Sequence, residues 1–145
     1  MKKIITAIPR RYIPSVLFGG GVLFFGIFIN GVYNLHHTFR DIDKLYHVLG
    51  GFALGWFFYT HLFFKKSDPH GFSWWHQLLI IVSTVCFVGV LWEYAERLST
   101  LYGPTYTPWL YAWFNGGNFN DTLLDLCADM FGAAAFFVLA PQKKV

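Results

Sequence analysis

Four long apolar runs, separated by short polar stretches, dominate the hydropathy pattern of the sequence. They cover roughly residues 13–33, 45–64, 74–94 and 123–140. Each run has about the 20 residues that an α-helix needs to cross a hydrocarbon core of ~30 Å. The pattern therefore predicts an all-α, polytopic membrane protein: a bundle of about four transmembrane helices that forms a single membrane domain over residues 1–145.

The connections between the runs predict how the helices are arranged. Residues 34–44 and 65–73 are short and polar, which makes consecutive helices antiparallel neighbours. The third connection, residues 96–120, is longer and contains prolines and glycines around the aromatic run 109–114. Because Trp and Tyr favour the headgroup region, we expect an interfacial aromatic loop with a short helix before the last span.

The composition argues against a soluble domain. Apolar residues make up 55% of the chain, aromatic residues 21% and charged residues only 13%, whereas a soluble domain has ~25% charged residues. In so short a chain the 17 Phe, 8 Tyr and 6 Trp would leave large apolar patches in water, but lipid accepts them. Cys86 and Cys127 fall inside predicted spans and show no zinc-type or disulfide spacing.

The basic residues predict the orientation of the helices. Four spans would place most of them on one side of the membrane, and only Arg40, Lys44 and Arg97 on the other. By the positive-inside rule, both termini are then cytoplasmic in a multi-pass protein of the inner (cytoplasmic) membrane. The first apolar run is too long for a signal peptide and lacks a cleavage site, so it reads as an uncleaved helix. The net charge of +3 needs no nucleic-acid partner to explain it.

The acidic residues are distributed unevenly between the two sides. Asp68 alone lies on the predicted cytoplasmic side. An ionisable group inside a span costs ~2.5–3.5 kcal/mol, so it persists mainly where it faces a partner, a cavity or a metal. The acids at the outer end of the predicted bundle are Asp41, Asp43, Glu93, Glu96, Asp121, Asp125 and Asp129.

Helical spacing groups several of these acids into one candidate site. Asp43 and His47 are four residues apart and share a helix face, as do Asp121 and Asp125. As single residues, Asp43 and Asp121 are equally well explained as helix caps, but capping explains neither His47 nor Asp125. The predicted metal ligands are Asp43, His47, Glu93, Asp121 and Asp125, and the candidate catalytic groups are His47, Asp43, Glu93 and Asp125.

Three further residues have a secondary place in this site. Lys44 is a candidate counter-ion for one of the acids. Glu96 stands next to Arg97, which favours an interfacial ion pair over a role as a ligand. Asp129 lies two turns below Asp121 on its helix and is therefore expected to be ~12 Å deeper in the membrane than Asp121.

Carboxylates with one imidazole suit a divalent metal such as Mg²⁺, Mn²⁺ or Zn²⁺. Clustered like charges also cannot all stay ionised without a cation or protons. A metal there would polarise a phosphoryl oxygen or activate water, which favours hydrolysis or transfer on a lipid or polyprenyl phosphate. Two alternatives stay open: a proton or cation pathway along the inward-stepping acids, and a small accessory subunit that associates with other membrane subunits.

Short motifs stand at the ends of the predicted helices: Asp43-Lys-Leu-Tyr-His47, Trp92-Glu93-Tyr-Ala-Glu96 and Asp121-Thr122-Leu-Leu-Asp125, followed by Gly132-Ala133. In this order they resemble the VanZ-like membrane proteins and their inner-membrane relatives over roughly residues 41–135. The resemblance implies a bacterial membrane bundle with its site at the ends of helices two to four. The chain has Gly-Gly-Asn-Phe-Asn at 116–120 where the VanZ pattern is Arg-rich. The resemblance therefore does not extend to the glycopeptide-related role that named the family.

Overall fold

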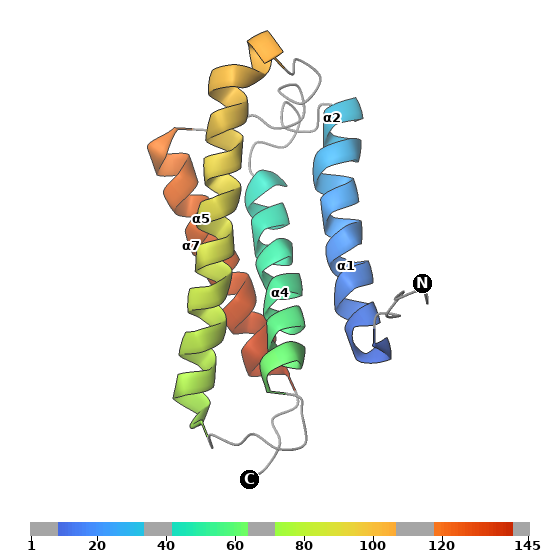
Figure 1. The fold of residues 1–145 in the computed structure, drawn as a ribbon, viewed down its shortest axis with the longest axis vertical. Coiled ribbons are helices and arrows are strands. Elements are labelled where there is room, and N and C mark those ends of the chain that lie inside the picture. Colours follow the sequence, from blue (N-terminus) through green and yellow to red (C-terminus); the bar gives the residue numbers. More distant parts are fainter. Residues whose placement is uncertain (1–8, 34–41, 64–71, 107–117, 141–145) are drawn as a thin grey trace, which may run out of the picture.

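The computed structural model describes residues 9–33, 42–63, 72–106 and 118–140, and all regular secondary structure in these ranges is helical (Figure 1). The all-α prediction is confirmed for this part of the chain. The elements are η1 (Arg10–Tyr12), α1 (Ile13–Leu23), the π-helical η2 (Phe24–Ile29), α2 (Asn30–Tyr33), α4 (Ile42–Leu62), α5 (Trp74–Tyr106) and α7 (Phe119–Leu139).

These elements form four long helical segments that alternate in direction (Figure 1). The first segment is continuous from η1 through α2. α4 lies between α1 on one side and α5 and α7 on the other, and its most extensive packing is against α7. η1 and the C-terminal end of α7 lie at the same end of the bundle (Figure 1).

Three helices in the described ranges are long and apolar enough to cross a membrane: Arg10–Phe28, Trp74–Tyr106 and Phe119–Leu139. α4 also has 21 residues, but its first two turns carry Asp43, Lys44 and His47. The bundle exposes large apolar side chains on its outside, among them Leu17 and Phe131, which are 70% and 66% exposed. Such a surface suits lipid and not water.

The third helix extends further than the apolar run predicts. The expected span ends at residue 94 and gives way to an interfacial loop, whereas α5 continues to Tyr106 and has 33 residues. It is therefore ~50 Å long, well beyond the ~30 Å of a hydrocarbon core. Pro104 lies only two residues before its end, where a missing N–H and a ring clash disturb little of the helix. Residues 107–117, the rest of the expected loop, lie outside the described residues.

The last helix begins earlier than predicted because of a specific cap. The Asn118 side chain accepts hydrogen bonds from the backbone N–H groups of Asn120 and Asp121, at 3.0 and 3.2 Å. This satisfies two of the free N–H groups at the start of α7. Asp121 is therefore a first-turn residue and not the cap.

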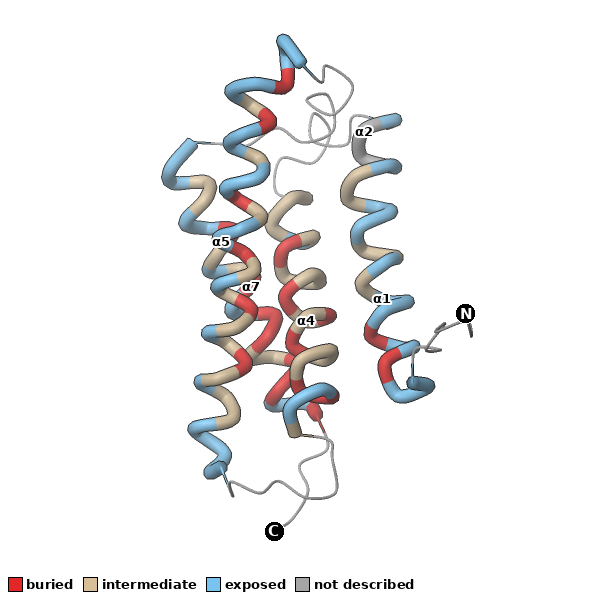
Figure 2. The backbone as a smooth tube through the Cα atoms, in the orientation of Figure 1, coloured by how far each residue is buried: buried red, intermediate tan, exposed pale blue. Residues whose placement is uncertain are grey.

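Glycines let α4 and α7 approach each other until their backbones touch. A Cβ added to Gly51 would overlap the backbone of Asp129, and one added to Gly132 would overlap the backbone at Val48 and Phe52. No side chain separates the two helices at this level. The apolar core extends from this contact toward the C-terminal ends of α4 and α7 (Figure 2). Its buried members are Tyr59, Ile81, Val85, Ala133, Phe136, Phe137 and Ala140.

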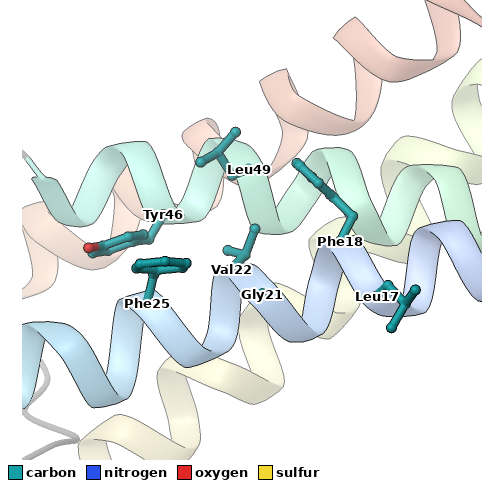
Figure 3. Close-up of a pocket in the computed structure, with 7 residues that line it drawn as sticks. All are labelled: Leu17, Phe18, Gly21, Val22, Phe25, Tyr46 and Leu49. Carbon is teal, nitrogen blue, oxygen red and sulfur yellow. The ribbon is translucent and has the colours of Figure 1, made fainter.

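The packing of α1 on α4 is looser and leaves an apolar groove. The first segment approaches α4 closely where Gly19 of α1 faces Ala53 and where Gly26 of η2 faces the Tyr46 ring; a Cβ on either glycine would lie 3.4 Å from its neighbour. Between these contacts is a groove of about 460 Å³ (Figure 3). Its lining residues are Leu17, Phe18, Gly21, Val22, Phe25, Tyr46 and Leu49.

Candidate functional site

Charged and polar side chains from three helices meet near the end of the bundle at which α4 and α7 begin. We call them the polar cluster: Asp43, Lys44 and His47 of α4, Glu93 of α5, and Asp121, Asp125 and Asp129 of α7. The cluster is open at one end and closed at the other. The side chains of Asp43 and Asp121 are 32% and 37% exposed, whereas that of Asp125 is 3% exposed.

Lys44 occupies the open end of the polar cluster. Its Nζ lies 2.6 Å from Asp121 Oδ1, 2.7 Å from Asp125 Oδ1 and 3.6 Å from Asp43 Oδ2. The sequence predicts this lysine as a counter-ion for one acid, and the structure places it beside three. The contact with Asp121 is a charge-assisted hydrogen bond, a kind that is among the strongest that polar side chains make.

His47 is buried at the centre of the polar cluster, and both of its ring nitrogens face carboxylates. Nδ1 lies 3.3 Å from Asp129 Oδ1. Nε2 lies 3.8 Å from Asp125 Oδ1 and 3.9 Å from Glu93 Oε1. The imidazole therefore touches side chains from both α5 and α7.

Glu93 is buried, and its two carboxylate oxygens have different surroundings. Oε2 accepts a hydrogen bond of 2.8 Å from Thr122 Oγ1 of α7. Oε1 has no hydrogen-bond partner among the described residues and faces His47. A buried carboxylate oxygen left unpaired is costly, so it points to a group that completes the site.

Three members of the polar cluster have ligand atoms close enough to share one metal ion. Each of Asp43, His47 and Asp125 offers one such atom, and these atoms lie within 4.8 Å of one another. Two oxygen ligands and one nitrogen ligand fit Mg²⁺, Mn²⁺ or Zn²⁺. The five carboxylates of the cluster face a single lysine, so the charge balance also favours a further cation.

Asp129 belongs to the polar cluster, although its spacing predicts a deeper, separate position. α7 runs obliquely across the bundle (Figure 1), and the Gly51 contact draws α4 against it at Asp129. Asp129 also faces α5, where a Cβ on Gly89 would lie only 2.6 Å from Asp129 Oδ2. The sequence indicates no role for Gly89 or for Thr122, although Thr122 precedes Asp125 by three residues and so shares its face.

Glu96 bonds to Trp92 and not to Arg97, its predicted ion-pair partner. Its Oε1 accepts a hydrogen bond of 2.7 Å from the indole Nε1 of Trp92, and within the described part of α5 it makes no ion pair with Arg97. Glu96 and Arg97 are consecutive, so their side chains leave the helix in different directions.

The remaining histidines in the described residues lie away from the polar cluster. His61 Nδ1 is 3.2 Å from the Tyr12 hydroxyl, and His76 Nδ1 is 2.6 Å from the Ser73 hydroxyl. Both histidines lie near the helix ends that are opposite the polar cluster.

A helical bundle with an apolar exterior and a buried polar cluster defines an α-helical integral membrane protein. The chain belongs to the family described as predicted membrane protein (DUF2238), whose model matches residues 12–142. The match includes every residue of the polar cluster. No curated protein and no solved structure matches the chain.

Proposed function

We propose that this protein binds a divalent cation in the polar cluster and acts on the phosphate group of a lipid or polyprenyl phosphate. The observation that carries the proposal is the buried Oε1 of Glu93, which has no hydrogen-bond partner within the described residues and lies 3.9 Å from His47 Nε2. Asp43, His47 and Asp125 would hold the ion, with Glu93 and Asp121 beside them. A bound divalent ion polarises a phosphoryl oxygen and lowers the pKa of a bound water.

The residues of the cluster would divide the remaining chemistry between them. His47 is the only imidazole in the cluster, and its contact with Asp129 orients the ring. A ring held in this way would present Nε2 to the ion, and Glu93 Oε1, 3.9 Å from Nε2, could take a proton from an attacking hydroxyl or water. Thr122 keeps Glu93 turned toward the same space.

The position of the cluster within the bundle supports a lipid substrate. Its exposed edge, Asp43 and Asp121, lies where α4 and α7 begin, so it is reached from one face of the membrane. On the neighbouring face of α4, Tyr46 and Leu49 line the apolar groove toward α1 (Figure 3). A hydrocarbon chain lying in this groove would bring its polar end to the level of Asp43, three residues from Tyr46.

The topology proposed with this function has four spans in the inner (cytoplasmic) membrane and both termini in the cytoplasm. In this topology α4 also spans the membrane, in addition to the three helices named above, and α5 and α7 cover its polar first turns. The excess of Lys and Arg at one end supports this orientation. The motif order by which residues 41–135 resemble the VanZ-like proteins supports a shared site at the same helix ends.

Thermal unfolding in detergent tests the cation site. We expect Mn²⁺, Mg²⁺ or Zn²⁺ to raise the Tm of the wild type and to have much less effect on His47→Gln. His61→Gln, which removes an imidazole at the far end of the bundle, is the matched control and should respond like the wild type. Elemental analysis of the purified protein and phosphate release from lipid phosphates in mixed micelles complete the test.

If no divalent cation stabilises the wild type, the cation site is wrong and an accessory subunit becomes the better account. A proton pathway has one specific observation in its favour: His47 joins Asp125 to the deeper Asp129. Beyond Asp129, however, α7 continues into the buried apolar residues Ala133 and Phe137, which offer a proton no path. Proton flux into liposomes would distinguish this function from the enzymatic one.

A further inference from the structure

Lys44 is the one ammonium group in the polar cluster, and it is held by the same carboxylates that a metal would use. Its Nζ contacts Asp125 Oδ1 at 2.7 Å, and that same oxygen lies 3.8 Å from His47 Nε2. Asp125 Oδ1 therefore stands between an organic cation on one side and an imidazole on the other. An ion placed beside His47 and Asp125 would have Lys44 as a close, like-charged neighbour.

We propose that Lys44 is a tethered, exchangeable counter-ion, and that a divalent cation entering the cluster displaces its ammonium from Asp125 and Asp121. This inference rests on the proposed function, because it describes how the same site is regulated. Without the cation, Lys44 neutralises part of the carboxylate charge and keeps the bundle stable. With the cation bound, the ammonium is released at the open end of the cluster.

The side chain has the properties that such an exchange needs. Lysine is a point charge on a long, flexible stem, so it can leave one set of partners without moving its helix. The Lys44 side chain is 26% exposed, so a route toward solvent already exists.

The inner carboxylates of the cluster are not neutralised by Lys44, which favours binding of a cation. Among the residues that the structure describes, Glu93 Oε1 is buried without a hydrogen-bond partner, and Lys44 forms no ion pair with Glu93 or Asp129. The lysine therefore balances only the outer carboxylates. A divalent ion near His47 would serve both the outer and the inner acids, which one ammonium does not.

A substitution of the lysine tests the exchange. In Mn²⁺ titrations followed by thermal unfolding in detergent, we expect Lys44→Met to reach half-saturation at about tenfold lower Mn²⁺ than the wild type, because a partly exposed competing ion pair is gone. Lys44→Arg keeps the charge and should stay near the wild-type value. Equal or weaker Mn²⁺ binding by Lys44→Met would overturn the inference.

A second measurement uses the wild-type protein, in case Lys44→Met does not fold. Brief acetylation with acetic anhydride, read by mass spectrometry, reports whether the Lys44 amine is shielded by carboxylates. We expect saturating Mn²⁺ to raise acetylation of Lys44 severalfold, while the other lysines of the chain serve as internal references. Unchanged or reduced acetylation at Mn²⁺ concentrations that stabilise the protein would show that the ammonium stays in place.

The outcomes separate this inference from the proposed function. Stabilisation of the wild type by Mn²⁺ with no change in Lys44 acetylation and no gain in Lys44→Met leaves the cation site intact and removes the exchange. Stabilisation of Lys44→Met alone would overturn the exchange, because the wild-type lysine would then never give up its place to Mn²⁺. Stabilisation of neither protein removes both proposals.

Discussion

Thr122 of α7 donates a hydrogen bond of 2.8 Å to Glu93 Oε2 of α5, and this bond fixes which carboxylate oxygen faces the imidazole of His47. The bond joins two helices through residues that are 29 positions apart in the sequence. It also spares Glu93 a second unpaired oxygen, because Oε1 already lacks a donor in the described part of the chain.

Replacing the hydroxyl of Thr122 by a methyl group should destabilise the bundle. Thr122→Val leaves buried Glu93 with neither oxygen paired, so we expect a loss of ~1–3 kcal/mol in the free energy of unfolding. Thr122→Ser keeps the donor and should lose less. Thr84→Val is the matched control, since that hydroxyl bonds only the Ile80 carbonyl one turn back in its own helix. Denaturant unfolding in detergent measures all three.

Adding a single methyl group at Gly51 should be far more costly than adding one at its neighbour. Gly51→Ala places Cβ in the backbone of Asp129, so the helices must separate, at a cost of ~1–3 kcal/mol. Gly50→Ala meets nothing within 4 Å and should be neutral or slightly stabilising, because Ala favours a helix. Equal stability of the two variants would contradict the close contact between α4 and α7.

Removing the charge of Asp125 should abolish the response to cations more than it affects folding. Asp125→Asn keeps the shape of the side chain and relieves repulsion between the acids, while it weakens the ion pair with Lys44. We expect wild-type stability to rise by ~2.7 kcal/mol at a cation concentration of about 100 Kd, and Asp125→Asn to show little of this rise. Identical melting of both proteins under every cation would remove the main support for a metal site.

Filling the groove between α1 and α4 should impair turnover of a lipid phosphate without affecting the cation. Gly21 lines the groove, so the side chain of Gly21→Phe would occupy the space proposed for the hydrocarbon chain (Figure 3). Gly20→Phe is the matched control, because Gly20 is exposed and does not line the groove. We expect phosphate release to fall only for Gly21→Phe, and the Mn²⁺-dependent rise in Tm to be the same for both.

The proposed topology predicts which reporters are active at each end of the chain. A cytoplasm-dependent reporter fused after Val145 should be active, and a periplasm-dependent reporter at the same place should be inactive. A fusion within residues 34–41 should give the opposite pattern. Activity of the periplasmic reporter at Val145 would reverse the orientation and move the open end of the cluster to the cytoplasmic face.

The apolar runs are sufficient to predict the helices but not where they end. Length and hydropathy locate each helix, because lipid requires an uninterrupted apolar span. The ends depend on single residues: Asn118 starts α7 early through its side-chain bonds, and Pro104 is tolerated because it stands close to the end of α5. The π-helical segment Phe24–Ile29 has no mark in the hydropathy pattern.

The sequence predicts those features of the candidate site that depend on the direction of the helices. It does not predict the features that depend on how closely α4 and α7 cross. Asp43, His47 and Asp125 meet because α4 and α7 begin at the same end, which the alternating spans already indicate. The contact of His47 with Asp129 depends instead on how closely α4 approaches α7. That distance is set by Gly51, and counting turns along separate helices does not reveal it.

The glycine contact between α4 and α7 also bears on ionic radius. At the level of Asp129 the backbones of α4 and α7 already touch, so the distance between the two helices cannot decrease or shift to fit a bound ion. Ca²⁺ takes six to eight oxygens at about 2.3–2.6 Å, whereas Mg²⁺ takes six ligands at about 2.0–2.1 Å. A larger coordination shell would require the first turns of α4 and α7 to move apart, while the glycine contact holds the two helices together at Asp129. The same two glycines that join the helices would therefore make the cluster discriminate against large ions.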